Sequence, residues 1–112
     1  MARILLLEDD ADQLELRAMA LQRLGHEVIK AASAPEAISS GCDCDVLIAD
    51  LLPGAEELLA SVPQSTAVIV LSGRDQVSEA VARRSAAVLR KPCRSATLME
   101  AITRALWTSP SK

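Results

Sequence analysis

The stretch ILLLEDD, residues 4–10, runs four consecutive aliphatic side chains directly into three carboxylates. The aliphatic half is typical of a strand covered on both faces, as in a parallel sheet. Clustered carboxylates repel one another, so they belong at the end of such a strand, in a turn, a helix start or a cation site. The rest of the sequence has to distinguish these three alternatives.

The composition is that of one globular domain. The chain has 112 residues, of which 50% are hydrophobic and 24% charged, so it is long and apolar enough to bury a core. The formal net charge is −3 and the basic residues are scattered, so the sequence does not indicate a basic surface that would bind nucleic acid. No apolar segment approaches the length of a membrane span and no secretory signal pattern opens the chain, so we expect a cytoplasmic protein without membrane contact.

Cysteine and aromatic residues are few. Cys42, Cys44 and Cys93 are odd in number and lack the ligand spacing of a zinc site. We therefore expect neither a disulfide framework nor a metal held by thiolates. Trp107 is the only aromatic residue, so the core is expected to consist of Leu, Val, Ile and Ala.

Strand-like and helix-like segments alternate along the chain. The expected strands are residues 3–7, 27–31, 45–49, 67–71 and 86–90, and the expected helices are residues 12–24, 34–38, 55–60, 75–84 and a last one capped by Ser95 that reaches Leu106. Short connections without hairpin turns predict an α/β fold, a doubly wound five-stranded parallel sheet with helices on both faces. Residues 1–107 form the predicted domain, and residues 108–112 have the composition of a flexible C-terminal tail.

Polar side chains stand where four of these strands end. Glu8, Asp9 and Asp10 follow the first strand, and Asp50, Ser72 and Lys91 follow the third, fourth and fifth. Each alone has an ordinary interpretation as a helix cap, a turn residue or a solvated side chain. Open α/β sheets bind ligands outside the carboxyl ends of their strands. The convergence of these residues on that edge therefore favours a binding site.

Four motifs carry a resemblance to a known family. ILLLEDD, VLIADLLPG, VLSG and VLRKP, in this order and each closing a strand, resemble the receiver domain of bacterial two-component response regulators. The resemblance covers about residues 2–106 and implies a flavodoxin-like sheet of strand order 2-1-3-4-5. It also implies a phosphoacceptor in a phosphorelay, which takes a phosphoryl group from a sensor histidine kinase or a histidine phosphotransfer protein. The phosphorylated form would then switch a surface that a downstream protein target or an output domain reads.

The resemblance assigns roles to the residues of the motifs. Asp50 matches the phosphoacceptor, Ser72 the switch hydroxyl, and Lys91 the lysine that pairs with phosphoryl oxygens. Phosphoryl transfer has a loose transition state, so these groups mainly position reactants and neutralise charge. The proline after Lys91 permits a cis peptide bond, which in the family aims the lysine inward.

The family's metal site also maps onto this chain. Glu8 and Asp9 match the acidic pair that holds Mg²⁺, with Asp9 as a direct ligand and Glu8 acting through water. Asp50 and the backbone carbonyl of Leu52 would complete the protein ligands. A hard cation with oxygen ligands and several waters suits a site where an anionic side chain meets an anionic phosphoryl donor. Asp10 falls outside the pair and is assigned to the cap of the first helix.

The sequence departs from the family pattern at several positions. Val88 stands where the family has Tyr or Phe coupled to the switch hydroxyl, and Cys93 replaces a large apolar or aromatic residue. The loop after Asp50 reaches its proline sooner, and the fourth-helix segment, residues 75–86, is shortened. The shorter loop would move the carbonyl of Leu52, and the shortened fourth helix would alter the surface on which the family's partners dock. The resemblance leaves a homodimer through the face of the fourth and fifth helices open.

Two other interpretations compete with a phosphorylated receiver. The first is a receiver-like adaptor that binds partners without phosphorylation. The second is a small enzyme such as an aspartate-nucleophile phosphatase, which generally needs an acid two residues beyond the nucleophile, whereas Leu51 and Leu52 follow Asp50. No Gly-rich loop after the first strand supports nucleotide binding. We therefore expect no enzyme activity beyond self-catalysed phosphoryl transfer and slow release of phosphate. Both a stand-alone receiver and a piece of a longer protein agree with the sequence.

Overall fold

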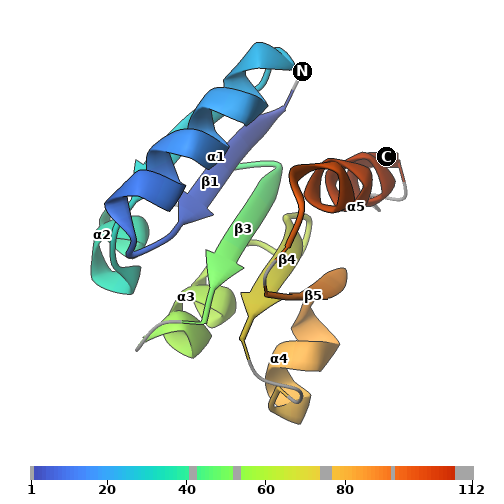
Figure 1. The fold of residues 1–112 in the computed structure, drawn as a ribbon. Coiled ribbons are helices and arrows are strands. Elements are labelled where there is room, and N and C mark those ends of the chain that lie inside the picture. The colour runs from blue at the N-terminus through green and yellow to red at the C-terminus, as the bar shows by residue number, and fades with distance from the viewer. Residues whose placement is uncertain (1, 41–42, 52–53, 74–76, 92, 108–112) are drawn as a thin grey trace.

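The computed structural model of the chain describes residues 2–40, 43–51, 54–73, 77–91 and 93–107. Strands and helices alternate throughout, as Figure 1 shows. The strands are β1 (Arg3–Leu7), β2 (Glu27–Ala31), β3 (Val46–Asp50), β4 (Ala67–Ser72) and β5 (Ala87–Arg90), and the helices are α1 (Ala11–Arg23), α2 (Ala34–Ser39), α3 (Ala55–Ser61), α4 (Glu79–Arg84) and α5 (Ser95–Trp107).

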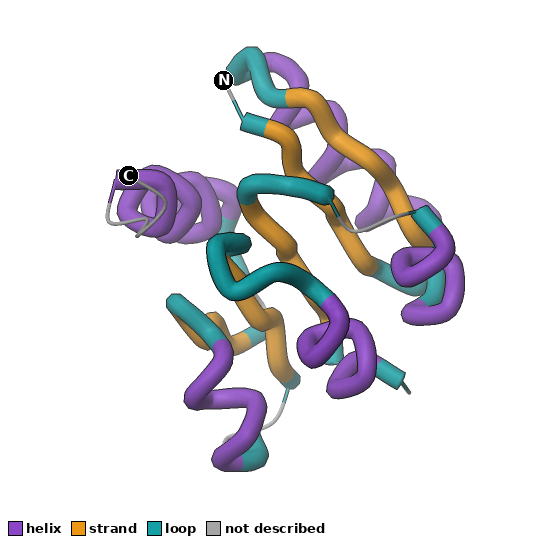
Figure 2. The backbone as a smooth tube through the Cα atoms, turned by 180° about the vertical axis from the view of Figure 1, so that it is seen from behind, coloured by secondary structure: helices purple, strands orange, loops and turns teal. Residues whose placement is uncertain are grey.

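The five strands form one sheet in the order β2-β1-β3-β4-β5, and every pair is parallel. Figure 2 shows the strands between two layers of helices. The predicted doubly wound fold and its strand order are therefore confirmed. Because the strands are parallel, their carboxyl ends lie at one edge: Asp50 is paired with Leu71, and Ser72 with Arg90.

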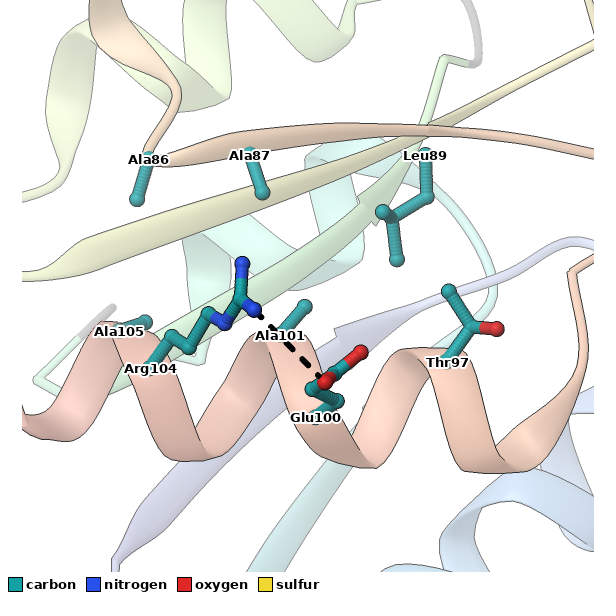
Figure 3. A pocket seen from close by; sticks show the side chains of 8 residues that line it. All are labelled: Ala86, Ala87, Leu89, Thr97, Glu100, Ala101, Arg104 and Ala105. Atoms are coloured by element: carbon teal, nitrogen blue, oxygen red, sulfur yellow. Dashed lines mark ion pairs between the residues drawn. The ribbon is translucent and has the colours of Figure 1, made fainter.

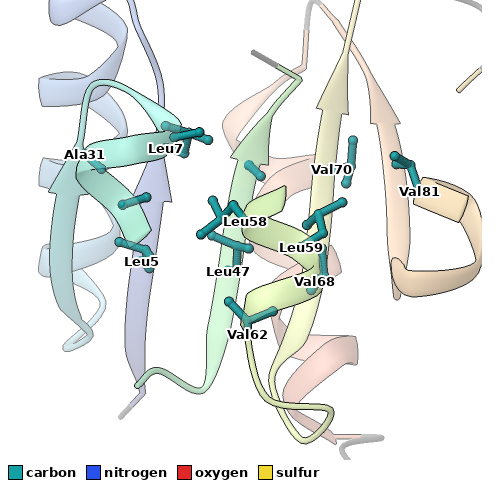
Figure 4. Packing of buried hydrophobic residues seen from close by; sticks show 13 residues of the cluster. Leu5, Leu7, Ala31, Leu47, Leu58, Leu59, Val62, Val68, Val70 and Val81 are labelled. Carbon is teal, nitrogen blue, oxygen red and sulfur yellow. The ribbon is translucent and has the colours of Figure 1, made fainter. Parts of the chain in front are cut away.

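The sheet separates two hydrophobic clusters. Ile4 and Leu6 of β1 point to the face covered by α1 and α5, whereas Leu5 and Leu7 point to the face covered by α2, α3 and α4. Figure 4 shows the second cluster, in which Leu58 of α3 packs over the strands. Their fully buried members are Leu, Ile, Val and Ala, as the lack of aromatic residues predicted, and burial of each large aliphatic side chain contributes about 1.5–3 kcal/mol.

Helix α1 begins and ends as local sequence signals dictate. The Asp10 carboxylate accepts hydrogen bonds from the backbone N–H groups of Asp12 and Gln13, which confirms the predicted cap. Gly25 follows the helix with φ of 93°, a conformation that favours glycine. Leu24, the last residue of the expected helix 12–24, lies beyond the last helical residue and is 59% exposed, so the predicted end of this helix is one residue too long.

A second glycine brings two helices together. Gly54 precedes α3 with φ of 86°, and a Cβ atom there would stand 3.2 Å from the Cβ of Ala34 in α2. A non-glycine residue would be strained by this backbone conformation. Gly54 therefore permits both the entry into α3 and the close contact between α2 and α3.

The predicted element bounds fail mainly in the fourth helix. It was expected from residue 75, yet α4 starts at Glu79, after Ser78 caps it by accepting a hydrogen bond from Val81 N–H. Val77 packs on the core from outside the helix. Strands β3 and β4 each extend through the polar residue predicted to follow them. Helix α5 starts at Ser95 itself, which was expected to be its cap.

Candidate functional site

The candidate site lies at the edge where the strands end. Glu8 follows β1, Asp50 is the last residue of β3, Ser72 is the last of β4, and Lys91 follows β5. The backbone N–H of Lys91 donates to the carbonyl oxygen of Ser72 over 2.8 Å, so pairing continues past the end of β5. The sheet register thus places four polar or charged side chains at the ends of neighbouring strands.

Three carboxylates gather at this edge. One carboxylate oxygen from each of Glu8, Asp9 and Asp50 lies within 4.8 Å of the others. Glu8 and Asp50 are 2% and 6% exposed, whereas Asp9 is exposed. Buried carboxylates require compensating positive charge, and an all-oxygen donor set is the kind that hard divalent cations prefer. The cluster therefore fits a Mg²⁺ ion with Asp9 on the solvent side.

Lys91 supplies positive charge to the nucleophile candidate. Its Nζ lies 2.7 Å from Oδ1 of Asp50, and the Lys91 side chain is 30% exposed. Ser72 is buried, 2% exposed, one position beyond the residue that pairs with Asp50. The structure thus brings Lys91 and Asp50 into direct contact and places Ser72 on the strand between them.

Both oxygens of Glu8 accept hydrogen bonds. Oε1 lies 2.6 Å from Nη1 of Arg17, and Oε2 accepts from the backbone N–H of Asp10 over 3.2 Å. The pKa of Glu8 is raised above its ordinary value of 4.5, mainly because burial removes water from the carboxylate. The negative charge of Asp50 raises this pKa further, while the Asp10 N–H, Lys91 and Arg17 act in the opposite direction without reversing the shift.

Arg17 is a residue that sequence reasoning missed. The sequence motifs assign it no role, yet its side chain is only 14% exposed and contacts Glu8. A signal was present, because Arg17 stands three residues after Leu14 and directly before Ala18, both buried. Residues three and four apart share a helix face, so Arg17 had to lie at the margin of the buried face.

Some of the remaining predicted site residues lie outside the part of the chain that the structure describes. Leu52, predicted as a carbonyl ligand, and the proline after Lys91 lie outside the described residues. Val88 in β5 is 41% exposed, so the position at which the family has an aromatic ring faces outward here. Cys44 and Cys93 are both partly buried.

A cavity of about 220 Å³ lies between β5 and α5, and its lining does not include Glu8, Asp9 or Asp50. Figure 3 shows that small side chains such as Ala86, Ala87 and Ala101 border it, with an ion pair between Glu100 and Arg104 at its margin. No residue of the acidic cluster lines it. We therefore assign the chemistry to the strand ends and not to this cavity. Within the described part of the chain, no helix has the length and apolar character needed to cross a bilayer.

Comparisons with known proteins give a consistent result for structure. No protein-family model matches the chain, and the search of curated proteins found no match. The chain is 28% identical to a response regulator receiver domain protein from Clostridium thermocellum, covering 95% of this chain and 94% of that one, with a TM-score of 0.82. It is 26% identical to a CheY-like response regulator receiver domain protein from Methanospirillum hungatei JF-1, with 95% and 94% covered and a TM-score of 0.85.

A third similar structure is longer than this chain. NtrX from Brucella abortus is 26% identical, with a TM-score of 0.83. The match covers 96% of this chain and 26% of NtrX. The chain therefore corresponds to one segment of that protein.

Proposed function

This chain is a response-regulator receiver domain, and we propose that Asp50 accepts a phosphoryl group from a phosphohistidine of a sensor kinase or of a histidine phosphotransfer protein. The observation that carries the proposal is the contact of buried Asp50 with Lys91 at 2.7 Å inside a cluster of three carboxylates. An ion pair with a purely structural role would not need two further carboxylates beside it. An anion that must approach a carboxylate does need cations poised beside it.

The reaction is a transfer between nitrogen and oxygen. An oxygen of the Asp50 carboxylate forms a bond to phosphorus, the P–N bond of the donor breaks, and its electron pair returns to the imidazole, which takes up a proton. Lys91 remains near the product and pairs with phosphoryl oxygens. Mg²⁺, held by Asp9, Asp50 and Glu8, would neutralise the charge that develops on the transferred group.

Phosphorylation would act as a switch. The phosphoryl group adds about two negative charges and strong acceptor oxygens. The Ser72 hydroxyl donates a hydrogen bond to one of them, which draws the segment after β4 inward and shifts a pre-existing equilibrium between two conformations. The affected surface is α4, β5 and α5, and its reader is a downstream protein, an output domain or a second copy of this chain. A cytoplasmic location remains part of the proposal.

The test is labelling with a small phosphodonor such as phosphoramidate. With Mg²⁺ present, we expect intact-mass analysis to find one phosphoryl group per chain, located on Asp50 by peptide mapping after borohydride reduction. The matched control is Asp12→Asn, because Asp12 is an exposed aspartate in the first turn of α1. Asp12→Asn should label like wild type, and Asp50→Asn should not label.

Three results would overturn parts of this proposal. Labelling of Asp50→Asn to the wild-type level would exclude Asp50 as the acceptor. Labelling that is unaffected by EDTA would exclude the metal role. Equal binding of a partner with and without phosphodonor would favour the adaptor, and turnover of a pool of phosphodonor far beyond one equivalent would indicate an enzyme.

A further inference from the structure

The buried ion pair of Glu8 and Arg17 stands apart from the roles assigned above. Arg17 reaches from the second turn of α1 to the end of β1, where its Nη1 lies 2.6 Å from Oε1 of Glu8. The Arg17 side chain is 14% exposed and the Glu8 side chain is 3% exposed. A charged pair with so little water contact is screened weakly, so each member strongly affects the other's charge.

The pair changes the charge that a metal ion meets. Three carboxylates occupy the cluster, and two internal cations contact it, Lys91 on Asp50 and Arg17 on Glu8. The net charge of this group is therefore −1 in place of −3. A divalent cation is attracted much less by such a site than by three unpaired carboxylates.

Both carboxylate oxygens of Glu8 already accept a hydrogen bond from a group of the protein. One oxygen is held by Arg17 and the other by the backbone N–H of Asp10. A metal ion, or a metal-bound water, that engages Glu8 must share it with Arg17 or displace the guanidinium. The bond to Asp10 lies within the turn itself and fixes the orientation of the carboxylate.

We propose that Arg17 is a positioning residue that acts through Glu8 as a built-in competitor of Mg²⁺, so that the guanidinium sets the metal affinity of the site. This inference rests on the proposed metal site at Glu8, Asp9 and Asp50. The guanidinium orients the Glu8 carboxylate by direct contact, and it weakens metal binding by its positive charge. The phosphoryl-transfer step at Asp50 is left unchanged once metal is bound.

The experiment is isothermal titration calorimetry with MgCl₂ on the whole chain, with all variants in the same buffer. Arg17→Met keeps much of the apolar stem and removes the charge. We expect its Mg²⁺ affinity to rise about tenfold, because removal of one positive charge beside the carboxylates strengthens their attraction for a divalent ion. Arg17→Gln, which keeps a donor for Glu8, should show a similar rise and serves if Arg17→Met fails to fold.

Two control variants isolate the charge on Glu8. Arg17→Lys keeps the positive charge and should bind Mg²⁺ close to the wild-type affinity. Arg23→Met makes the same change in the last turn of α1, at an exposed position six residues and about 9 Å along the helix axis away, and should also leave the affinity near wild type. In phosphoramidate labelling, Arg17→Met should reach half-maximal rate at a lower Mg²⁺ concentration with an unchanged maximal rate.

The outcomes separate this inference from the proposed function. If wild type and Arg17→Met bind Mg²⁺ equally, or if the variant binds more weakly, the role of Arg17 is wrong while the metal site stands. If neither binds Mg²⁺, the metal site itself is wrong. An equal rise in Arg23→Met would show a general charge effect and would also overturn the inference.

Discussion

Replacing Asp50 by Asn removes one of three clustered carboxylates while it preserves the shape of the side chain. In the metal-free protein Asp50 is 6% exposed and crowded by Glu8 and Asp9. Only Lys91 is in direct ionic contact with it among the described residues. The sign of the stability change therefore depends on whether repulsion or attraction is larger.

The distances set the size of each electrostatic interaction of Asp50. At the 4.8 Å limit of the cluster, repulsion from buried Glu8 is about 3.5 kcal/mol at an effective dielectric of about 20, and repulsion from exposed Asp9 is about 1 kcal/mol at a water-like dielectric. The attraction to the partly exposed ammonium of Lys91 at 2.7 Å is about 3 kcal/mol at a dielectric of about 40. Repulsion and attraction are thus of similar size, and the desolvation of the buried charge, which Asn avoids, decides the sign.

We therefore expect Asp50→Asn to stabilise the metal-free protein by about 1–2 kcal/mol, which raises the melting temperature by about 4 °C or more for a domain of this size. Thermal denaturation followed by circular dichroism in EDTA measures the shift. Lys91→Met is the matched comparison, because it removes the attraction and leaves both repulsions, so it should melt below wild type. The reasoning is refuted if Asp50→Asn melts below wild type in EDTA, or if Lys91→Met melts above it.

Two further predictions concern a backbone position and a titration. Gly54→Ala should cost about 1–2 kcal/mol because φ is 86° and the new Cβ meets Ala34, whereas Gly73→Ala, with open space around it, should be nearly neutral; equal losses in urea denaturation would contradict this. The pKa of Glu8 is raised in the folded state, so the folded protein holds the proton of this carboxyl group more tightly than the unfolded chain does. The stability that this protonated group contributes is present below pH 4.5 and is lost as pH rises through the folded pKa. In EDTA, wild type should lose stability relative to Glu8→Gln over that window, and a difference independent of pH would contradict the shift.

The strands were predictable because burial on both faces leaves continuous apolar runs, and β1 and β2 agree with the prediction residue for residue. Strands β3 and β4 run one residue further, through Asp50 and Ser72. Sheet hydrogen bonds join backbone groups, so pairing does not stop where a side chain becomes polar. The site residues are therefore part of the sheet and gain its rigidity.

The start of α4 and the role of Arg17 could not be predicted in the same way. Val77 has an apolar side chain at helical spacing from Val81, but it is partly buried from a non-helical segment, and spacing alone does not separate these cases. Arg17 is explained only by Glu8, which is nine residues away in sequence and on another element. The chemical roles of Asp50, Ser72 and Lys91 came from the family resemblance, whereas their convergence followed from the topology.

The two-sided packing of the sheet has a consequence for how this domain can diverge. Adjacent residues of one strand, such as Leu6 and Leu7, pack into separate clusters. Helices on opposite faces of the sheet therefore share no packing partners, and the energetic effects of substitutions in them are expected to add. The side with α4 can therefore be remodelled for new partners by substitution, while the side with α1 keeps the acidic pocket in register.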